Sequence, residues 1–370
     1  MVTYRVLEFQ DMIRPKRLIK TFLELVKIDS ISGKEQEIAK EVAKRLKALG
    51  GKVTIDKVGN VIGKFPGGDE PLMLNAHLDT VEPGRGIKPI IKGDKITSDG
   101  TTILGGDCKA GLAVILEALA SLKEEKTKHL PIEIVFTVQE EINLAGSKNL
   151  DYSKLSSKRG LVFDGGPEAE RIDISSPTYY RVDITIKGRS AHAGFEPEKG
   201  ISVIQIAGHI LSKLKLGRID PETTANIGLI QGGSVRNAIP DLVQLYGEIR
   251  SRNPKKLEKH SIHFKNVVQR VLNKYSEASI DITIEKEIDG YLLKDDHKML
   301  IFATNVLSQI ELEPLYQHSG GLTDANIFHA KGIEVVTVGI GNHLAHTTRE
   351  YVVIPEMLQS ARFCEKAVKV

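Results

Sequence analysis

The sequence predicts an α/β protein in which a helix-flanked mixed sheet is interrupted by a smaller α+β domain with ferredoxin-like order. Short apolar runs alternate with helical patterns up to about residue 178 and again after about residue 293. Between these parts the predicted order changes to β-α-β-β-α-β. We therefore expect one domain formed by residues 1–178 and 293–370, and an inserted domain at 179–292.

The first part of the chain has the pattern of a layered α/β structure. Helical apolar spacing covers residues 15–26 and 33–49, and the second helix begins at Ser32-Gly33-Lys34-Glu35, which has the form of a capping box. The elements that follow are strands near 52–56, 60–64, 71–76, 132–138 and 160–164 and helices near 109–123 and 144–150. We expect helices on both faces of the sheet.

The inserted segment begins after Pro177 with a strand of strict alternation. Its predicted elements are strand 180–187, helix 199–214, strands 224–231 and 242–250, helix 254–275 and strand 279–288. The α/β pattern then resumes with helices near 297–309 and 322–330, a strand at 334–339 and a closing helix at 355–368.

Composition limits the classes of partner. Lys and Arg number 51 against 48 Asp and Glu in 370 residues, and the charges alternate in sign along the predicted helices, which disfavours a nucleic-acid partner. The first thirty residues are too charged for a secretory signal or a membrane span. The two cysteines, Cys108 and Cys364, form no Cys-x-x-Cys pattern, so we expect a reduced, cytoplasmic protein that does not bind membranes.

Five acidic and histidine residues are associated with the ends of short apolar runs: His77, Asp107, Glu141, Asp164 and His346. Each has an ordinary explanation when taken alone, such as a helix N-cap for Asp107. A charged group just past a buried strand needs a partner, however, and one shared metal site would supply it for all five. Two histidines and three carboxylates form a ligand set that suits zinc, cobalt or manganese.

Neighbouring residues extend this hypothesis. Asp79 follows His77 at a spacing of two, so both side chains lie on one side of an extended segment and Asp79 can orient the ring. In Glu140-Glu141 one carboxylate can bind metal while the other takes a proton from the attacking water. Spacing does not decide between His343 and His346 as the ligand.

These residues lie in motifs that resemble the dizinc peptidase family of peptidase T, bacterial glutamate carboxypeptidase, aminoacylase and succinyl-diaminopimelate desuccinylase. The motifs are His77-Leu78-Asp79-Thr80-Val81, Gly105-Gly106-Asp107-x-Lys109-x-Gly111, Glu140-Glu141, Asp164-Gly165-Gly166, Ser190-Ala191-His192, Gly320-Gly321-x-x-Asp324 and His346. The resemblance covers nearly the whole chain, and residues 97–105 are most similar to the peptidase T branch.

The resemblance implies a ligand set for two zinc ions. His77 and Asp164 would hold one ion, Glu141 and His346 the other, and Asp107 would bridge them. It also implies a cis bond between Asp107 and the next residue.

The resemblance also assigns catalytic and substrate-binding roles. Asp79 would orient His77, and Glu140 would be the general base that later protonates the departing amine. His192 would donate to the developing oxyanion, reaching the site of a partner subunit. Asn237 and Arg250 resemble residues that bind the polar or carboxylate end of the substrate.

Two positions depart from the family pattern. Cys108 stands where a small or polar residue is usual; we expect a neutral, packed thiol there, with a competing metal ligand as the alternative. Asn143 replaces a glycine that commonly follows the glutamate pair, and asparagine tolerates the left-handed backbone that such a turn needs.

Together these observations predict a cytoplasmic aminopeptidase acting on tripeptides or other short peptides, forming a homodimer through the inserted domain. The same centre would serve a carboxypeptidase or an N-acyl-amino-acid deacylase, and a catalytically silent binding protein is a more distant alternative. The glycines near 105–111 suggest nucleotide binding, but neither Gly-x-x-x-x-Gly-Lys-Ser/Thr nor Gly-x-Gly-x-x-Gly occurs there, which argues against it.

Overall fold

The structure is a computed structural model that describes residues 13–68 and 70–370. The chain forms two compact units, the first containing the residues up to Ile174, Leu293–His318 and Thr323–Val370, and the second Ser175–Leu292 and Ser319–Leu322. The sequence placed the inserted domain at 179–292 and did not predict that Ser319–Leu322 joins it. Residues 1–12 of the predicted first domain lie outside the described residues. Among those described, every helix is too short or too polar to span a bilayer.

A mixed sheet forms the centre of the first unit. The order of its strands is β1-β2-β6-β3-β7-β16-β8, with β15 also paired to β8. Their bounds are β1 (Lys52–Ile55), β2 (Val61–Phe65), β6 (Ile132–Thr137), β3 (Leu72–His77), β7 (Arg159–Phe163), β16 (Glu334–Val338), β8 (Arg171–Ser176) and β15 (Leu315–His318). The four neighbours β6, β3, β7 and β16 run parallel, so their carboxyl ends lie at one edge of the sheet.

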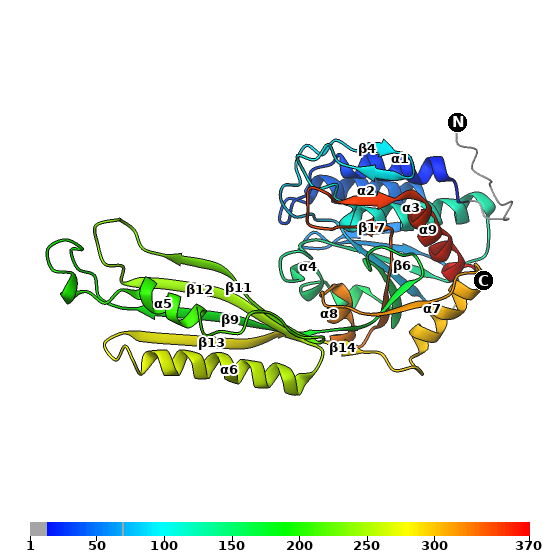
Figure 1. Cartoon of the computed structure of the whole chain (residues 1–370). Coiled ribbons are helices and arrows are strands. Elements are labelled where there is room, and N and C mark those ends of the chain that lie inside the picture. Colours follow the sequence, from blue (N-terminus) through cyan, green and yellow to red (C-terminus); the bar gives the residue numbers. More distant parts are fainter. Residues whose placement is uncertain (1–12, 69) are drawn as a thin grey trace. The chain divides into compact units, whose positions relative to one another are not determined.

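Helices flank this sheet (Figure 1). Three of them, α1 (Pro15–Val26), α3 (Gly106–Glu125) and α9 (Ile354–Val368), pack against one another, and α3 also contacts β3. The others are α2 (Gln36–Ala48) beside β1 and β2, α4 (Ala145–Lys148) against α8 (Asp324–Ala330), and α7 (Lys298–Gln309) against β16. A short 3-10 helix, η1, covers Tyr152–Lys154.

A small antiparallel sheet contacts α3 and α9, and no pattern in the sequence predicted it. It consists of β17 (Asn342–His343), β18 (Tyr351–Val353), β5 (Lys95–Thr97) and β4 (Ile90–Lys92). These strands have two or three residues each, and β4 is exposed throughout, so they carry no alternation that a sequence could display. The loop between β17 and β18 contains His346.

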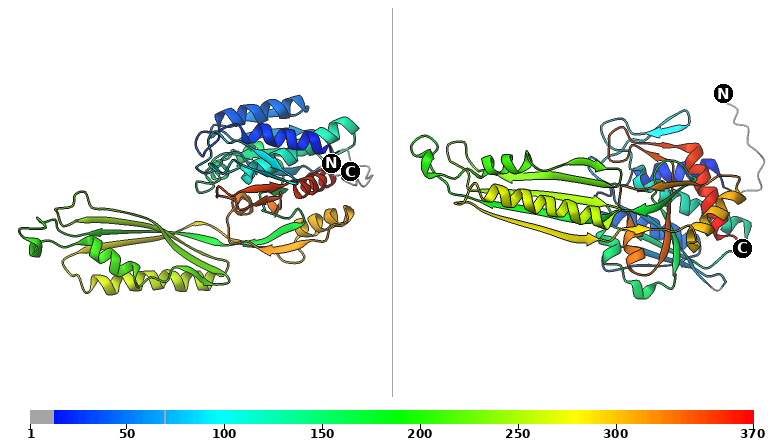
Figure 2. Two further views of the ribbon diagram at one scale, coloured as in Figure 1. Left: turned by 45° about the horizontal axis from the view of Figure 1, so that its top comes forward. Right: turned by 60° about the horizontal axis from the view of Figure 1, so that its bottom comes forward.

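The second unit has the predicted ferredoxin-like topology. Its antiparallel sheet has the order β10-β11-β12-β9-β13, formed by β10 (Gly217–Asp220), β11 (Thr223–Gly232), β12 (Leu242–Ser251), β9 (Thr178–Lys187) and β13 (Ser279–Ile288). Helices α5 (Val203–Leu211) and α6 (Pro254–Leu272) pack against this sheet (Figure 2). Alternating residues of β9, Val182, Ile184 and Ile186, are buried beneath them. A 3-10 helix η2 (Pro197–Lys199) and β14 (Tyr291–Leu292), paired with the end of β8, complete the unit.

Three element predictions were wrong in detail. Helix α2 begins at Gln36 without the capping box, because the Ser32 hydroxyl donates to Asp79 at 2.7 Å instead of capping the helix. The helix predicted from residue 199 begins only at Val203, since Ile201 forms a bridge with Arg189. The helix predicted at 144–150 is a single turn, α4, and strand β8 was not predicted at all.

Candidate metal centre

The five predicted metal ligands meet at the carboxyl edge of the parallel strands. His77 is the last residue of β3, Asp164 directly follows β7, and Glu141 follows β6. His346 comes after β16, in the β17–β18 loop, and Asp107 lies in the first turn of α3. Neighbouring parallel strands place their end residues side by side, and this edge is where α/β sheets commonly hold ligands.

The carboxylate of Asp107 lies between the two histidines. Its Oδ1 is 3.0 Å from His77 Nε2, and its Oδ2 is 3.3 Å from His346 Nε2. On the first side, Asp164 Oδ1 is 3.6 Å from His77 Nε2. On the second side, Glu141 Oε1 is 2.8 Å from His346 Nε2. Asp107 thus belongs to two groups of potential ligands, one through each oxygen.

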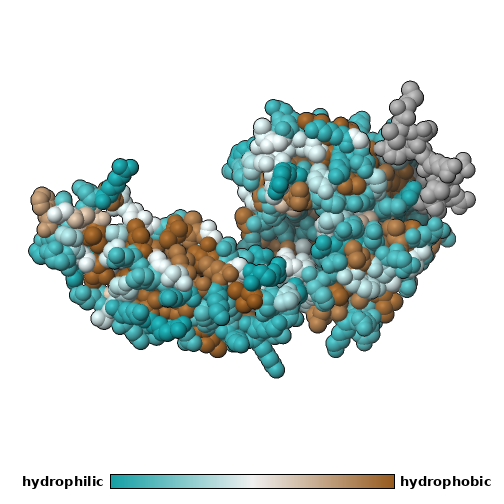
Figure 3. All heavy atoms as spheres, viewed as in Figure 1, coloured by the Kyte–Doolittle hydropathy of each residue, from teal (hydrophilic) through white to brown (hydrophobic). Residues whose placement is uncertain are grey.

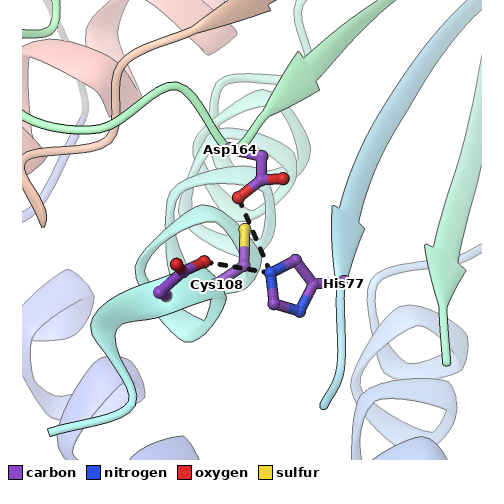
Figure 4. Close-up of side chains that lie close together, drawn as sticks. His77, Cys108 and Asp164 are labelled. Carbon is purple, nitrogen blue, oxygen red and sulfur yellow. Dashed lines mark hydrogen bonds and ion pairs between the residues drawn. The ribbon is translucent and has the colours of Figure 1, made fainter. Parts of the chain in front are cut away.

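Cys108 lies within the first group. Figure 4 shows its sulfur beside the His77 ring and the Asp164 carboxylate. The thiol is buried and donates to the carbonyl of Phe163 at 2.8 Å, and burial raises its pKa well above the usual value. The expectation of a neutral, packed thiol agrees with this environment. The Asp107–Cys108 bond is cis, as the resemblance implied.

Asp79 holds several parts of the site together. Its main-chain carbonyl lies 3.0 Å from His77 Nδ1, while its carboxylate is 3.4 Å from the same nitrogen. The two carboxylate oxygens accept the amides of Glu140 at 2.9 Å and Glu141 at 3.1 Å. Asp79 is therefore positioned to orient His77, though its carbonyl makes the shorter contact.

The charges at this edge favour cations. Hydrogen bonds to Asp107 and Glu141 raise the pKa of His346 to about 10. Burial opposes a charged His77 ring, but the surrounding acidic groups outweigh burial and its pKa lies well above the usual value. Burial also raises the pKa of Asp164 to about 7. Removing so many carboxylates from water is costly unless positive charge compensates them.

The donor set fits metal ions. In each of the groups His77/Asp107/Cys108/Asp164 and Asp107/Glu141/His346, one ligand atom per residue lies within 4.8 Å of all the others. Imidazole nitrogen and carboxylate oxygen are ordinary zinc ligands. Two ions held by one shared carboxylate would resemble the two-metal sites of hydrolases, in which the ions are ~3.5–4 Å apart.

Glu140 lies beside this centre but outside both of those groups. Its side chain is buried, and burial raises its pKa well above the usual value. A third cluster of possible ligand atoms joins it to His77 and Glu141. A carboxyl group in this position, with its pKa raised by burial, can take part in proton transfer beside the ligands.

Three further buried polar residues make hydrogen bonds in this unit and were assigned no role from the sequence. Glu350 accepts three amides of the Asp107 loop, Lys109 donates to the Ile28 carbonyl at 2.7 Å, and Asp324 accepts from the Thr137 hydroxyl. Burial lowers the pKa of Lys109 to about 7 and raises that of Asp324. Lys109 and Asp324 belong to the motifs that carry the family resemblance, whereas no pattern pointed to Glu350.

The two candidate histidines near the β17–β18 loop have different partners in the structure. His343 lies 2.7 Å from Glu356 and stacks on Tyr351 with ring centroids 4.6 Å apart. It belongs to none of the metal-binding groups among the described residues. Asn143 adopts the expected left-handed backbone, with φ 67°, in the turn after the glutamate pair.

His192 and Asn237 are neighbours in the second unit. The Ala193 amide donates to the Asn237 carbonyl at 2.9 Å, and His192 forms a bridge with Ala238. The His192 Nδ1 accepts the amides of Gly194 at 3.1 Å and Phe195 at 3.2 Å. The exposed ring therefore carries its proton on Nε2, which makes that nitrogen a donor.

Arg250 lies elsewhere in the same unit. It occupies the end of β12, eight residues from Leu242, or roughly 26 Å along a strand. Leu242 pairs with Lys187, which leads into the His192 loop. Arg250 donates to Glu248 at 2.9 Å and lies over the ring of Tyr179. The predicted substrate-binding residues are thus divided between the two ends of one sheet.

Comparison with known proteins places the chain in one family. The sequence model of Peptidase family M20/M25/M40 matches residues 73–370. The uncharacterized protein YqjE of Bacillus subtilis is 38% identical over 366 residues, covering 95% of this chain and 97% of its own. The crystal structure of aminopeptidase PepT from Bacillus cereus is 37% identical with a TM-score of 0.83, covering 96% of this chain and 98% of that one.

A tripeptidase from Staphylococcus aureus is 35% identical with a TM-score of 0.89 and covers 97% of this chain and 98% of its own. These likenesses agree with the motifs and with the fold described above. The chain belongs to Peptidase family M20/M25/M40, is similar to the peptidase T members, and is a metallopeptidase.

Proposed function

We propose that the protein is a dizinc aminopeptidase that cleaves tripeptides or other short peptides. The observation that carries the proposal is the placement of Asp107, whose two oxygens lie 3.0 Å and 3.3 Å from the nitrogens of two different histidines. His77 and Asp164 complete one metal site, and Glu141 and His346 complete the other. Cobalt or manganese would suit the same donors.

The bound metals would polarise the substrate carbonyl and lower the pKa of the attacking water. Glu140 receives the proton of that water, because its buried carboxylate has a raised pKa and lies beside the ligands. The same carboxyl then gives the proton to the departing amine. The Asp79 carboxylate accepts the main-chain amide of Glu140, and this contact holds the backbone of the proposed base in place.

His192 supports the proposal from the second unit. Its Nδ1 accepts two amides, so its Nε2–H can donate to the oxygen that gains charge during attack. Asn237 and Arg250 would bind the polar ends of the substrate. Because Arg250 lies at the other end of the sheet, His192 and Arg250 of one chain would serve two different active sites in a homodimer.

An open strand edge supports association through the second unit. Only residues 223–225 of β11 pair with β10 among the described residues, which leaves the remainder of this edge open. Leu229, Ile230 and Leu242 are 44–53% exposed, and hydrophobic side chains gather over the β11–β12 part of the unit (Figure 3). Light scattering of the protein in solution would test the dimer.

One preparation can test the substrate class. Metal analysis would be combined with hydrolysis of tripeptides, dipeptides, N-acetylated amino acids and N-succinylated diamines. Cleavage of tripeptides only when their amino terminus is free supports the proposal. Preference for N-acyl substrates would instead favour a deacylase with the same centre, and cleavage from the other end would favour a carboxypeptidase.

A further inference from the structure

Glu350 binds the backbone of the segment that carries Asp107. It lies in the same β17–β18 loop as His346, and its side chain is buried. One carboxylate oxygen accepts the amides of Leu104 and Gly105, both at 2.7 Å. The other accepts the amide of Asp107 at 3.0 Å. A single carboxylate therefore fixes the backbone on both sides of Gly106.

Close packing holds the same backbone against the hairpin. A Cβ on Gly106 would lie 2.5 Å from Asn342 Oδ1 and 2.7 Å from a methyl group of Val352. Asn342 belongs to β17 and Val352 to β18, the strands on either side of the loop. The Asp107 segment thus rests on the element that presents His346.

We propose that Glu350 is a positioning residue of the metal centre, and this inference rests on the proposed function. By holding the Asp107 amide from the loop that carries His346, Glu350 sets the relative position of these two ligands. The site most affected is the one formed by Asp107, Glu141 and His346. Groups that orient metal ligands in this way commonly change metal affinity by 10–100-fold when they are lost.

Glu133 offers a matched control within the chain. It is also a buried carboxylate, and one oxygen accepts the amides of Ser156 and Ser157, both at 2.8 Å. It lies near the start of β6, whereas the metal centre lies beyond the end of that strand. Glu133→Gln therefore removes the same kind of amide contact without touching a ligand-bearing loop.

Apo protein would be titrated with Zn²⁺ by calorimetry and with Co²⁺ by visible absorption, for wild type, Glu350→Gln and Glu133→Gln. We expect two ions in wild type and in Glu133→Gln, and a ~10–100-fold weaker second ion in Glu350→Gln with an altered cobalt spectrum. Glu350→Asp retains the charge on a shorter stem and should give a smaller loss; it provides the measurement if Glu350→Gln does not fold.

Unchanged affinity for both ions in the Glu350 variants would overturn the inference while leaving the two-metal proposal intact. An equal loss in Glu133→Gln would also overturn it, since the effect would then be one of general stability. Wild-type protein that binds fewer than two ions would contradict the proposed centre itself, together with the role of Glu350 in it.

Discussion

One oxygen of Asp79 accepts the main-chain amide of Glu140 at 2.9 Å, and the same oxygen lies 3.4 Å from the ring of His77. The proposed base and a ligand of the first metal therefore share an anchor. Because the anchor holds the Glu140 backbone, the side chain can be changed without moving His77. With this geometry, a substitution can change proton transfer without changing metal binding.

Glu140→Gln should retain both metal ions and lose about 10²–10⁴-fold in kcat, since an amide cannot take the proton of the attacking water. Glu141→Gln should instead lose one ion, because it removes a ligand. Metal content and tripeptide hydrolysis measured on the same samples distinguish the two. Near-normal turnover in Glu140→Gln would refute its assignment as the base.

The two histidines of the β17–β18 loop form a second matched pair. His346→Gln should bind one ion where wild type binds two, because its Nε2 lies beside Asp107 and Glu141. His343→Gln should keep both ions, since His343 pairs with Glu356 instead. Metal analysis after dialysis provides the readout. Loss of an ion in His343→Gln but not in His346→Gln would reverse the assignment.

The division of His192 and Arg250 between the ends of one sheet predicts complementation. His192→Ala and Glu140→Ala should each be nearly inactive alone. When the two are unfolded and refolded together, the mixed dimer contains one site with Glu140 from one chain and His192 from the other. Activity near a quarter of wild type is expected for random pairing. No recovery, in a mixture shown to contain mixed dimers, would mean that His192 serves its own chain.

A histidine outside the proposed metal-binding groups, His329, should make stability pH-dependent. Burial lowers the pKa of His329 to about 4, below the ordinary value of 6.5. The unfolded chain therefore binds more protons between these values, so this contribution is complete above pH 6.5 and is lost as pH falls toward 4. The shift corresponds to at most about 3 kcal/mol in the free energy of unfolding.

Urea unfolding at pH 7.5 and pH 5 would measure this effect. His329→Gln should lose less stability on acidification than wild type, whereas His318→Gln, at an exposed position, should behave like wild type. Equal pH dependence in wild type and His329→Gln would show that other groups account for the acid sensitivity.

The convergence of the proposed ligands was predictable because the sequence shows where the buried strands end. Leu161 to Phe163 is a continuous apolar run, and the next residue, Asp164, lies at the sheet edge. In β3 the apolar residues Leu72 to Leu74 are followed by Asn75 and Ala76 before His77 ends the strand. Parallel pairing then brings these ends together. The choice of His346 over His343 was not open to this reasoning, because both follow the same strand and differ only in how the loop turns.

Contacts between distant parts of the chain limited how much of the remaining site and fold could be predicted from the sequence. Glu350 binds amides more than 240 residues earlier, and nothing in Thr-Thr-Arg-Glu marks it for that purpose. The capping box at Ser32 was wrong for the same reason, because Asp79 offers its hydroxyl a partner that local sequence does not show. Local patterns predict strands and helices; they do not say which tertiary partner will compete for a side chain.

The proposed metal ligands are spread along most of the chain. The first, His77, is made early, but His346 and the supporting Glu350 come after the last long strand of the sheet. A chain that ends before β17 would therefore lack His346, a ligand of the proposed second metal site, even if the strands before it were all formed.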